Sequence, residues 1–311
     1  MNVVPHTHWD REWYEPFEVF RLRLVDMLDD LVPRLESGDA GPHFMLDGQT
    51  AILDDYLELR PEMASRLRAL GESGRLGIGP WYVLMDEFLV SGETIVRNLQ
   101  RGLQHAAAYG GAMQVGYLPD MFGHIAQMPQ ILRLAGFEHA VVWRGVPAAV
   151  DRCAFLWSAP DGSLVRAEYL PQGYGNGAVL PTDPAALVDQ VNAFATRHEA
   201  LLVGDILWMN GTDHQAPAPY LRSVVAAANT QQTDCFFEIT SLAAHLRAAP
   251  TDGLAQWTGE LRSSARANLL MGVVSNRVDV KQAAATAEQS LERVAEPLCA
   301  LFTDALQWPE R

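Results

Sequence analysis

Histidine and aspartate side chains cluster near the start of the sequence, in the segment PHTHWDREWY. The segment begins at the carboxyl end of a short stretch, residues 3–6, that is typical of a buried strand. In an extended backbone, residues i and i+2 project to the same side, so His8 shares one face with His6 and with Asp10. An imidazole and a carboxylate presented together suit a divalent metal ion such as zinc. A polar strand end with hydrogen-bonded histidines is the alternative explanation.

Two further segments place carboxylates directly after apolar stretches. Asp120 lies in GYLPDMFGH, after an expected strand at residues 115–118. Asp213 and His214 lie in WMNGTDHQAP, after an expected strand at residues 205–210. Each segment alone is also explained as a turn, because Pro-Asp and Asn-Gly pairs favour turns. Three such strand ends converging on one rim would instead form a site.

A fourth segment, GPWYVLMDEFLVSGE, combines aromatic rings with carboxylates. Trp81, Tyr82, Asp86 and Glu87 follow the strand-like residues 76–79. Aromatic faces together with carboxylates are suited to binding sugars. Trp and Tyr also fill cores, so this segment alone leaves both interpretations open.

The elements that would hold these side chains alternate between short apolar runs and longer amphipathic ones. Strands are expected near residues 3–6, 43–48, 76–79, 115–118, 140–143, 164–170, 205–210 and 236–239, with helices between most of them. This alternation predicts βα units and an α/β fold. About seven such units favour a closed or nearly closed barrel, with its active site at the carboxyl ends of the strands. An open doubly wound sheet is the alternative, although no GxGxxG or Walker-type loop is present.

The pattern changes after Asp252, where a polar stretch precedes a long amphipathic helix expected from Asp279 to Leu306. A lone helix cannot bury its apolar stripe without partners. We therefore expect a second, helical domain that begins here and that this sequence does not complete.

Charge and composition exclude several classes of protein. The formal net charge is −15, and no cluster of Lys and Arg offers a surface for nucleic acid. No run of roughly 18 apolar residues predicts a membrane span. The N-terminus lacks the pattern of a signal peptide, so a cytoplasmic location is expected. The cysteines, Cys153, Cys235 and Cys299, lack metal-type spacing and are expected to be reduced.

The segments PHTHWDREWY, WYVLMDEFLVSGE, YLPDMFGHIAQMPQIL and NGTDH, in this order, resemble the bacterial branch of glycoside hydrolase family 38. The members of this family are α-mannosidases, so the expected partner is an α-mannoside. The resemblance implies a seven-stranded β/α barrel over residues 1–257. It also implies that residues 258–311 are the start of a helical middle domain.

The resemblance also implies roles for individual residues. A zinc ion, for which cobalt could substitute, would be held by His8, Asp10 and Asp120. Asp120 would attack the anomeric carbon in a retaining mechanism, and Asp213 would serve as acid and base. The side chains implied to bind the sugar are Trp9, Trp13, Asp86, Arg144 and His214. Tyr174 would line the pocket.

One departure concerns the metal. The family takes a further zinc ligand from a motif resembling HDSI, which has no counterpart here, so we expect a weakened site unless His6 or His214 substitutes. Two alternative functions remain at this stage: a metal hydrolase of the polysaccharide deacetylase type, and an inactive mannoside-binding fragment. The apolar face of the last helix could pack on the barrel, on a further domain or in a homo-oligomer.

Overall fold

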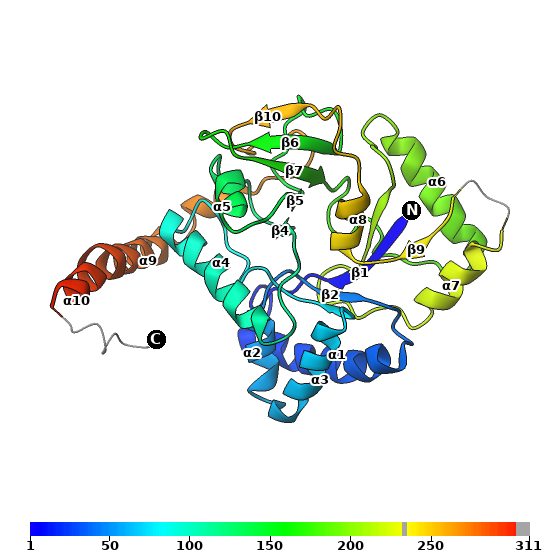
Figure 1. The fold of residues 1–311 in the computed structure, drawn as a ribbon, viewed down its shortest axis with the longest axis horizontal. Helices are drawn as coiled ribbons and strands as arrows, with labels where there is room; N and C mark the ends of the chain where they lie inside the picture. Colours follow the sequence, from blue (N-terminus) through cyan, green and yellow to red (C-terminus); the bar gives the residue numbers. More distant parts are fainter. Residues whose placement is uncertain (232–234, 303–311) are drawn as a thin grey trace.

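The computed structural model describes residues 1–231 and 235–302, which form an α/β fold with two five-stranded sheets (Figure 1). The first sheet has the order β3 (Leu76–Gly77), β2 (Phe44–Leu46), β1 (Asn2–Thr7) and β8 (Leu207–Asn210), and β9 (Glu238–Ile239) also pairs with β1. All of these pairs are parallel. Parallel pairing places the carboxyl ends of these strands at one edge.

The second sheet has the order β10 (Gln256–Thr258), β6 (Ala154–Ser158), β7 (Leu164–Tyr169), β5 (His139–Val142) and β4 (Gly116–Leu118). Here β6 and β7 pair antiparallel, while the other described pairs are parallel. The sheet is therefore mixed.

The two sheets meet at two places through isolated backbone hydrogen bonds. Met113 N donates to Ile78 O at 2.8 Å between β3 and β4, and Gly177 N donates to Met209 O at 2.9 Å between β7 and β8. Because single bonds replace a ladder at both places, the closed seven-stranded barrel is not confirmed, whereas the α/β class is.

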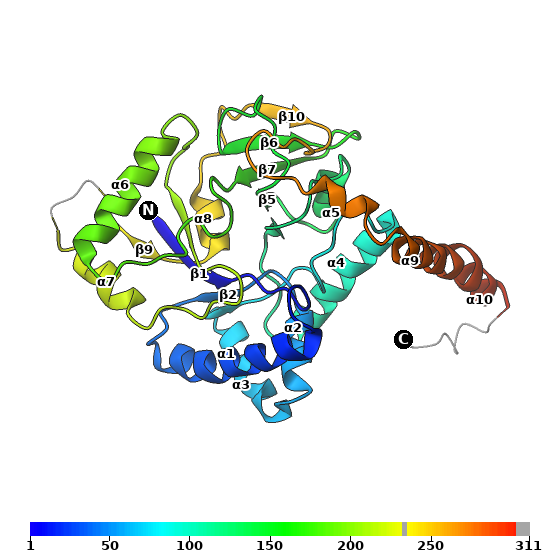
Figure 2. The ribbon, with the colours of Figure 1, turned by 180° about the vertical axis from the view of Figure 1, so that it is seen from behind.

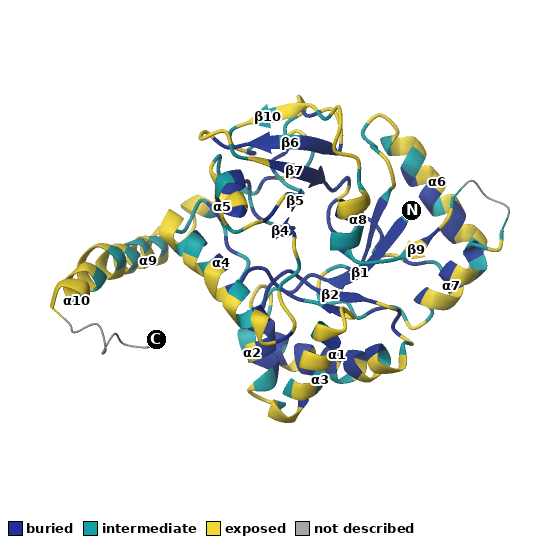
Figure 3. Ribbon diagram, in the orientation of Figure 1, coloured by how far each residue is buried: buried dark blue, intermediate teal, exposed yellow. Residues whose placement is uncertain are grey.

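A shared apolar core lies between the sheets. Val4 and Met209 from the first sheet, and Tyr117 and Val141 from the second, belong to one buried cluster. Their strands read as continuously apolar because both faces are covered, by the opposite sheet and by helices. Figure 3 shows β1, β2, β6 and β7 mostly in the colour of buried residues, whereas β9 and β10 are more exposed.

Helices surround the sheets (Figures 1 and 2). Their caps follow from local sequence: the Ser91 hydroxyl accepts from Thr94 N, and Gly38 ends α1 in the left-handed region with φ 84°. The helices are α1 (Phe17–Ser37), α2 (Ala51–Leu57), α3 (Ala64–Glu72), α4 (Gly92–Ala107), α5 (Met128–Leu134), α6 (Pro184–His198), α7 (Leu221–Ala228) and α8 (Leu242–Ala248). No helix among the described residues is long and apolar enough to span a membrane.

Packing against the sheets continues past residue 257. Leu261 is fully buried and exchanges backbone hydrogen bonds with His124 at 2.8 and 3.0 Å. Leu269 is also buried, with 2 % of its surface exposed.

The helical segment that follows extends away from the body of the molecule (Figures 1 and 2). It consists of α9 (Val278–Ser290), a π-helical turn (Leu291–Ala295) and α10 (Glu296–Phe302), and it buries none of its described residues. The expected helix from Asp279 to Leu306 is thus present as far as residue 302, and its last four residues lie outside the described range. The start of a separate helical domain is not confirmed.

Candidate active site

The side chains singled out by sequence gather at the carboxyl ends of the parallel strands. His8 follows β1, and the pairing of β1 with β8 brings it beside Asp213 in an isolated parallel bridge. Two backbone hydrogen bonds hold this arrangement: His8 N donates to Thr212 O at 3.1 Å, and His214 N donates to His8 O at 2.8 Å. Asp120 follows β4 from the opposite sheet. The predicted convergence on one rim is therefore present.

His8 is the centre of this cluster, with 4 % of its surface exposed. Its Nδ1 lies 2.8 Å from Asp47 Oδ1. Its Nε2 lies 3.7 Å from Asp10 Oδ1 and 4.0 Å from Asp120 Oδ2. Burial alone would lower the pKa of the imidazole, but Asp47, Asp10 and Asp120 outweigh it and raise that pKa to about 9.

Asp10 and Asp120 form a concentration of negative charge around His8. Burial raises the pKa of Asp10, and repulsion from Asp47 and Asp213 adds to the rise while His8 opposes it. Burial likewise raises the pKa of Asp120, although His8 and Arg144 oppose the rise. A cation between these groups would relieve the repulsion.

The donor set can be compared with what zinc requires. Ligand atoms around a tetrahedral zinc, bonded at about 2.0 Å, lie about 3.3 Å apart. The two distances from His8 Nε2, 3.7 and 4.0 Å, are longer than this by a few tenths of an ångström. In residues 1–231 and 235–302, no group of three or more His, Cys, Asp or Glu side chains is already close enough to hold a metal. The donor chemistry fits a divalent cation, and a small closure would be needed.

Arg144, predicted to bind substrate, instead contacts Asp120. Its Nε donates to Asp120 Oδ1 at 2.5 Å, and its Nη1 donates to the backbone carbonyl of Asn268. The guanidinium also stacks on the Trp143 ring, 3.9 Å from its centroid. Arg144 therefore positions Asp120 and ties the segment after β10 to the site.

Asp213 lies exposed at the rim, with Tyr174 beside it. The Tyr174 hydroxyl donates to Asp213 Oδ1 at 2.8 Å. The Tyr174 ring lies 4.5 Å from the His8 ring and 5.3 Å from that of Trp143, measured between centroids. Tyr174 thus connects the candidate acid to the wall of the cluster.

Two of the residues predicted to bind sugar have other roles in the structure. Trp9 is buried in the core with 2 % of its surface exposed, so its ring cannot stack on a ligand. His214 stacks on Phe20 at 4.3 Å, and its ring nitrogens lie 3.2 Å from Asp10 O and 3.3 Å from the Tyr14 hydroxyl. Trp9 packs into the core directly after β1, whereas His214, which follows β8, is half-buried against Phe20.

A small cleft opens beside Asp120. Its walls combine carboxylates with apolar side chains, which are His8, Asp10, Leu84, Met85, Asp86, Asp120, Met121 and Phe122. Asp86 is half-buried there, and burial raises its pKa. Trp13 is 65 % exposed, which leaves its ring available to a ligand. Asp86 and Trp13 thus keep their predicted role as possible sugar contacts.

Sequence reasoning missed Asp47, which is fully buried behind His8. A signal existed, because Asp47-Gly48 follows the strand Phe44–Leu46 as the other candidates follow theirs. It also missed the buried pair of Glu87 and His124, whose Oε1 and Nδ1 lie 2.6 Å apart. That pair holds the loop after β3 against the loop after β4.

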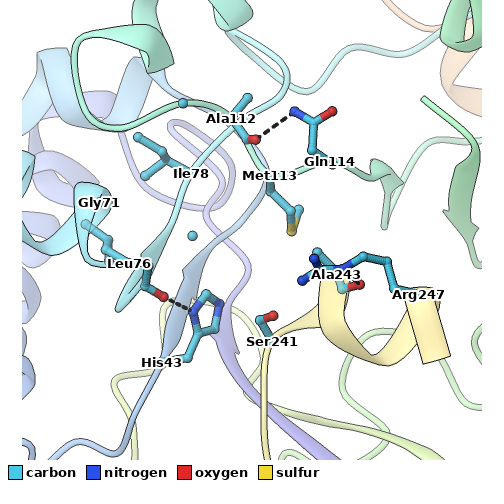
Figure 4. A pocket seen from close by; sticks show the side chains of 13 residues that line it. His43, Gly71, Leu76, Ile78, Ala112, Met113, Gln114, Ser241, Ala243 and Arg247 are labelled. Atoms are coloured by element: carbon cyan, nitrogen blue, oxygen red, sulfur yellow. Dashed lines mark hydrogen bonds between the residues drawn. The ribbon is translucent and has the colours of Figure 1, made fainter. Parts of the chain in front are cut away.

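A larger cavity of about 300 Å³ lies at the opposite, amino ends of β2, β3 and β4 (Figure 4). His43 and Ser241 line it, together with Arg247 and several glycines. None of the residues predicted to carry the chemistry lies there. The carboxyl ends of the strands, with the smaller cleft, are therefore the candidate active site.

The α/β fold and the carboxylate-lined cleft do not by themselves specify a family, whereas comparison with known proteins does. Residues 1–259 match the family model described as "Glycosyl hydrolases family 38 N-terminal domain". The chain belongs to glycoside hydrolase family 38, which confirms the resemblance inferred from its motifs. This membership favours a glycosidase over the deacetylase alternative.

Individual relatives support the same family assignment. A putative mannosylglycerate hydrolase from Halalkalibacterium halodurans is 36% identical over 96% of this chain and 36% of its own length. Human alpha-mannosidase 2C1 is 25% identical over 66% of this chain and 20% of its own length. The crystal structure of an alpha-mannosidase from Enterococcus faecalis V583 superposes with a TM-score of 0.89 at 34% identity, covering 96% of this chain and 35% of that one. The chain thus spans about a third of the length of these two bacterial relatives.

Proposed function

We propose that this chain carries the catalytic cleft of a metal-dependent retaining α-mannosidase. The observation that carries the proposal is the position of Asp120. Its carboxylate lies at the cleft, 4.0 Å from His8 Nε2 on one side and bonded to Arg144 on the other. The names of the relatives, an alpha-mannosidase and a putative mannosylglycerate hydrolase, support an α-mannoside as substrate.

In the proposed mechanism, a metal ion held by His8, Asp10 and Asp120 would supply positive charge that grips sugar hydroxyls and stabilises the transition state. Arg144 orients the Asp120 carboxylate for attack on the anomeric carbon. As the new bond between that carbon and Asp120 forms, the bond to the leaving oxygen breaks, and Asp213 protonates that oxygen. Asp213 then takes a proton from water, which releases mannose from Asp120 with the original α configuration.

The first experiment is hydrolysis of an aryl α-mannoside by the full chain, with added zinc, with chelator, and with the variant Asp120→Asn. Asp29→Asn serves as a matched control, because Asp29 also accepts hydrogen bonds, from Tyr56 and Arg60, but lies away from the cleft. We expect turnover that requires metal and Asp120, with α-mannose as the first product by NMR. Turnover that survives Asp120→Asn, or β-mannose as the first product, would overturn the proposal.

A binding role without turnover is the second candidate, and it is motivated by the distances from His8 Nε2 to Asp10 and Asp120, 3.7 and 4.0 Å, which are longer than a bound metal requires. It predicts that mannose perturbs the NMR signals of the cleft while no aryl mannoside is hydrolysed. Restoration of turnover in a chain extended to the length of the relatives would show that further ligands or contacts complete the site.

A further inference from the structure

His8 reaches the cleft from β1, and Asp47 supports it from β2. The register of the two strands pairs His6 with Met45 and Thr7 with Leu46, so His8 and Asp47 are the next residues along. Asp47 is fully buried, and its backbone has a positive φ of 35°. Gly48, with φ 66°, continues the turn, and a Cβ at that position would lie 2.8 Å from the Tyr117 ring. The turn therefore directs the Asp47 carboxylate back toward β1.

Donors surround the Asp47 carboxylate. Its Oδ1 lies 2.8 Å from His8 Nδ1. Its Oδ2 accepts from Trp9 N at 2.7 Å and from Gln49 Nε2 at 2.9 Å. Gln49 Nε2 also donates to Trp9 O at 2.8 Å, which fixes the orientation of the amide. Since a carboxylate can only accept, His8 Nδ1 carries a proton, and when the ring is neutral this is its single proton.

The position of this proton determines which ring nitrogen of His8 is free to bind a metal at the cleft. With Nδ1 bonded to Asp47, Nε2 is the atom that faces Asp10 and Asp120, at 3.7 and 4.0 Å. A histidine binds a metal through an unprotonated nitrogen, and the hydrogen bond made by the other nitrogen selects which one is available.

We propose that Asp47 is a positioning residue that holds His8 with Nδ1 protonated and Nε2 turned toward Asp10 and Asp120, and that it thereby sets the metal affinity of the site. This inference rests on the metal-dependent function proposed above. Asp47 itself touches neither the cleft nor the reacting atoms, and it acts through the ring of His8.

The isosteric change Asp47→Asn tests this inference, because an amide cannot satisfy all of the surrounding donors. Its oxygen is required by the N–H groups of Trp9 and Gln49, so its NH2 group must face His8. His8 Nδ1 would then have to accept, and the ring proton would move to Nε2, the atom needed for the metal. We expect zinc or cobalt binding, measured by calorimetry, to weaken about 10- to 100-fold.

Glu168→Gln is the matched control. Glu168 is also a buried carboxylate, it pairs with Arg166 at 2.8 Å on β7, and it does not line the cleft. A general loss of stability should affect both variants, whereas loss of metal affinity should be confined to Asp47→Asn. Equal metal affinity in Asp47→Asn and the unmodified chain would overturn the inference.

A second measurement separates this inference from the proposed function. The ring 15N shifts of His8, recorded without metal at alkaline pH where the ring is neutral, should report Nδ1–H in the unmodified chain and Nε2–H in Asp47→Asn. Should the unmodified chain bind no metal, the proposed function fails, while the 15N shifts still test the role of Asp47. An unchanged tautomer would refute it. If Asp47→Asn does not fold, Asp47→Ser, which also lacks the carboxylate, replaces it in the calorimetry.

Discussion

At the scale of single residues, Asp213 and Asp120 differ in the side chains that contact them. Asp120 is held by the Arg144 guanidinium, whereas Asp213 lies exposed and accepts from the Tyr174 hydroxyl at 2.8 Å. Arg144 and His8 oppose the rise that burial causes in the pKa of Asp120, which favours the ionised form that a nucleophile needs. The exposed position of Asp213 leaves its carboxyl group open to a leaving group at the rim.

Asp213→Asn should therefore slow hydrolysis in a way that depends on the leaving group. We expect a loss of about 10²- to 10⁴-fold for methyl α-mannoside, whose leaving oxygen needs a proton. The loss should be much smaller for the first turnover of a dinitrophenyl α-mannoside, which departs without one. Rates for both substrates, with Asp183→Asn at a helix cap as control, check this prediction. An equal loss on both substrates would count against Asp213 as the acid.

Arg144→Lys tests the orientation of the nucleophile. The planar guanidinium bonds Asp120 and the Asn268 carbonyl at once, whereas an ammonium is a point charge that cannot reproduce this geometry. We expect kcat to fall about tenfold or more, as for loss of one charged hydrogen bond. Steady-state kinetics with Arg152→Lys, an exposed arginine, as control would measure it. Unchanged kcat would show that Asp120 is oriented without Arg144.

The position of a residue could be predicted where its side chain follows a strand, but not where a neighbour determines its direction. His8, Asp120 and Asp213 were expected on one rim because strand ends converge, and their catalytic and metal-binding roles stay predictions. Trp9 was misassigned since its burial depends on α1 packing beneath it. The position of Asp47 after a strand was a signal, but its partner His8 is defined only by the register between β1 and β2, which a single sequence does not contain.

At the scale of elements, most strands and helices were predicted because apolar periodicity is local. The strand β6 was missed, although the turn that joins it to β7 has a clear signal in Pro160-Asp161-Gly162. Its antiparallel pairing could not be foreseen from a pattern of βα units. Closure of the barrel could not be predicted from the sequence either, since it depends on how far β3 and β4 lie apart.

The contact between α8 and β1 makes stability depend on pH. His245 is buried, and its Nδ1 lies 2.8 Å from Asn2 Nδ2. Burial, reinforced by Arg166, lowers its pKa from 6.5 to about 4. The folded chain thus keeps this ring neutral where the unfolded chain protonates it. The resulting stability is complete above pH 6.5 and is lost as the pH falls from 6.5 toward 4.

We expect this group to contribute about 3 kcal/mol to the free energy of unfolding at neutral pH. His245→Gln, which retains an acceptor for Asn2, should make the fall in stability between neutral and acid pH shallower. Urea unfolding at a series of pH values, with His105→Gln as control, measures the difference. Parallel pH profiles for His245→Gln and the unmodified chain would contradict this assignment.

At the scale of the whole molecule, the chain after β10 contains two segments that contact the rest of the protein in different ways. Residues 258–269 are part of the core, through Leu261 and Leu269. The helices α9 and α10 instead contact α4 at its exposed start, where Glu288 accepts from Thr94, Glu292 accepts from Ser91 and Glu296 pairs with Arg97. The first two contacts are half-buried and the third is exposed, and polar contacts open to solvent in this way contribute little to stability.

Two truncations should therefore behave differently. A chain ending at residue 277 loses the contacts to α4 and those of Lys281 to the carbonyls of Val273 and Asn276, so its Tm should change by less than about 3 °C. A chain ending at residue 255 also loses β10 and both leucines, which together stabilise by about 5 kcal/mol, so its Tm should fall by about 10 °C or more. Calorimetry of both chains measures the two Tm values and shows which segment stabilises the fold. A large fall in the Tm of the chain ending at residue 277 would contradict this prediction. It would mean that α9 and α10 stabilise the fold, and that they do so through the contact with α4 and not through the exposed apolar face of α10.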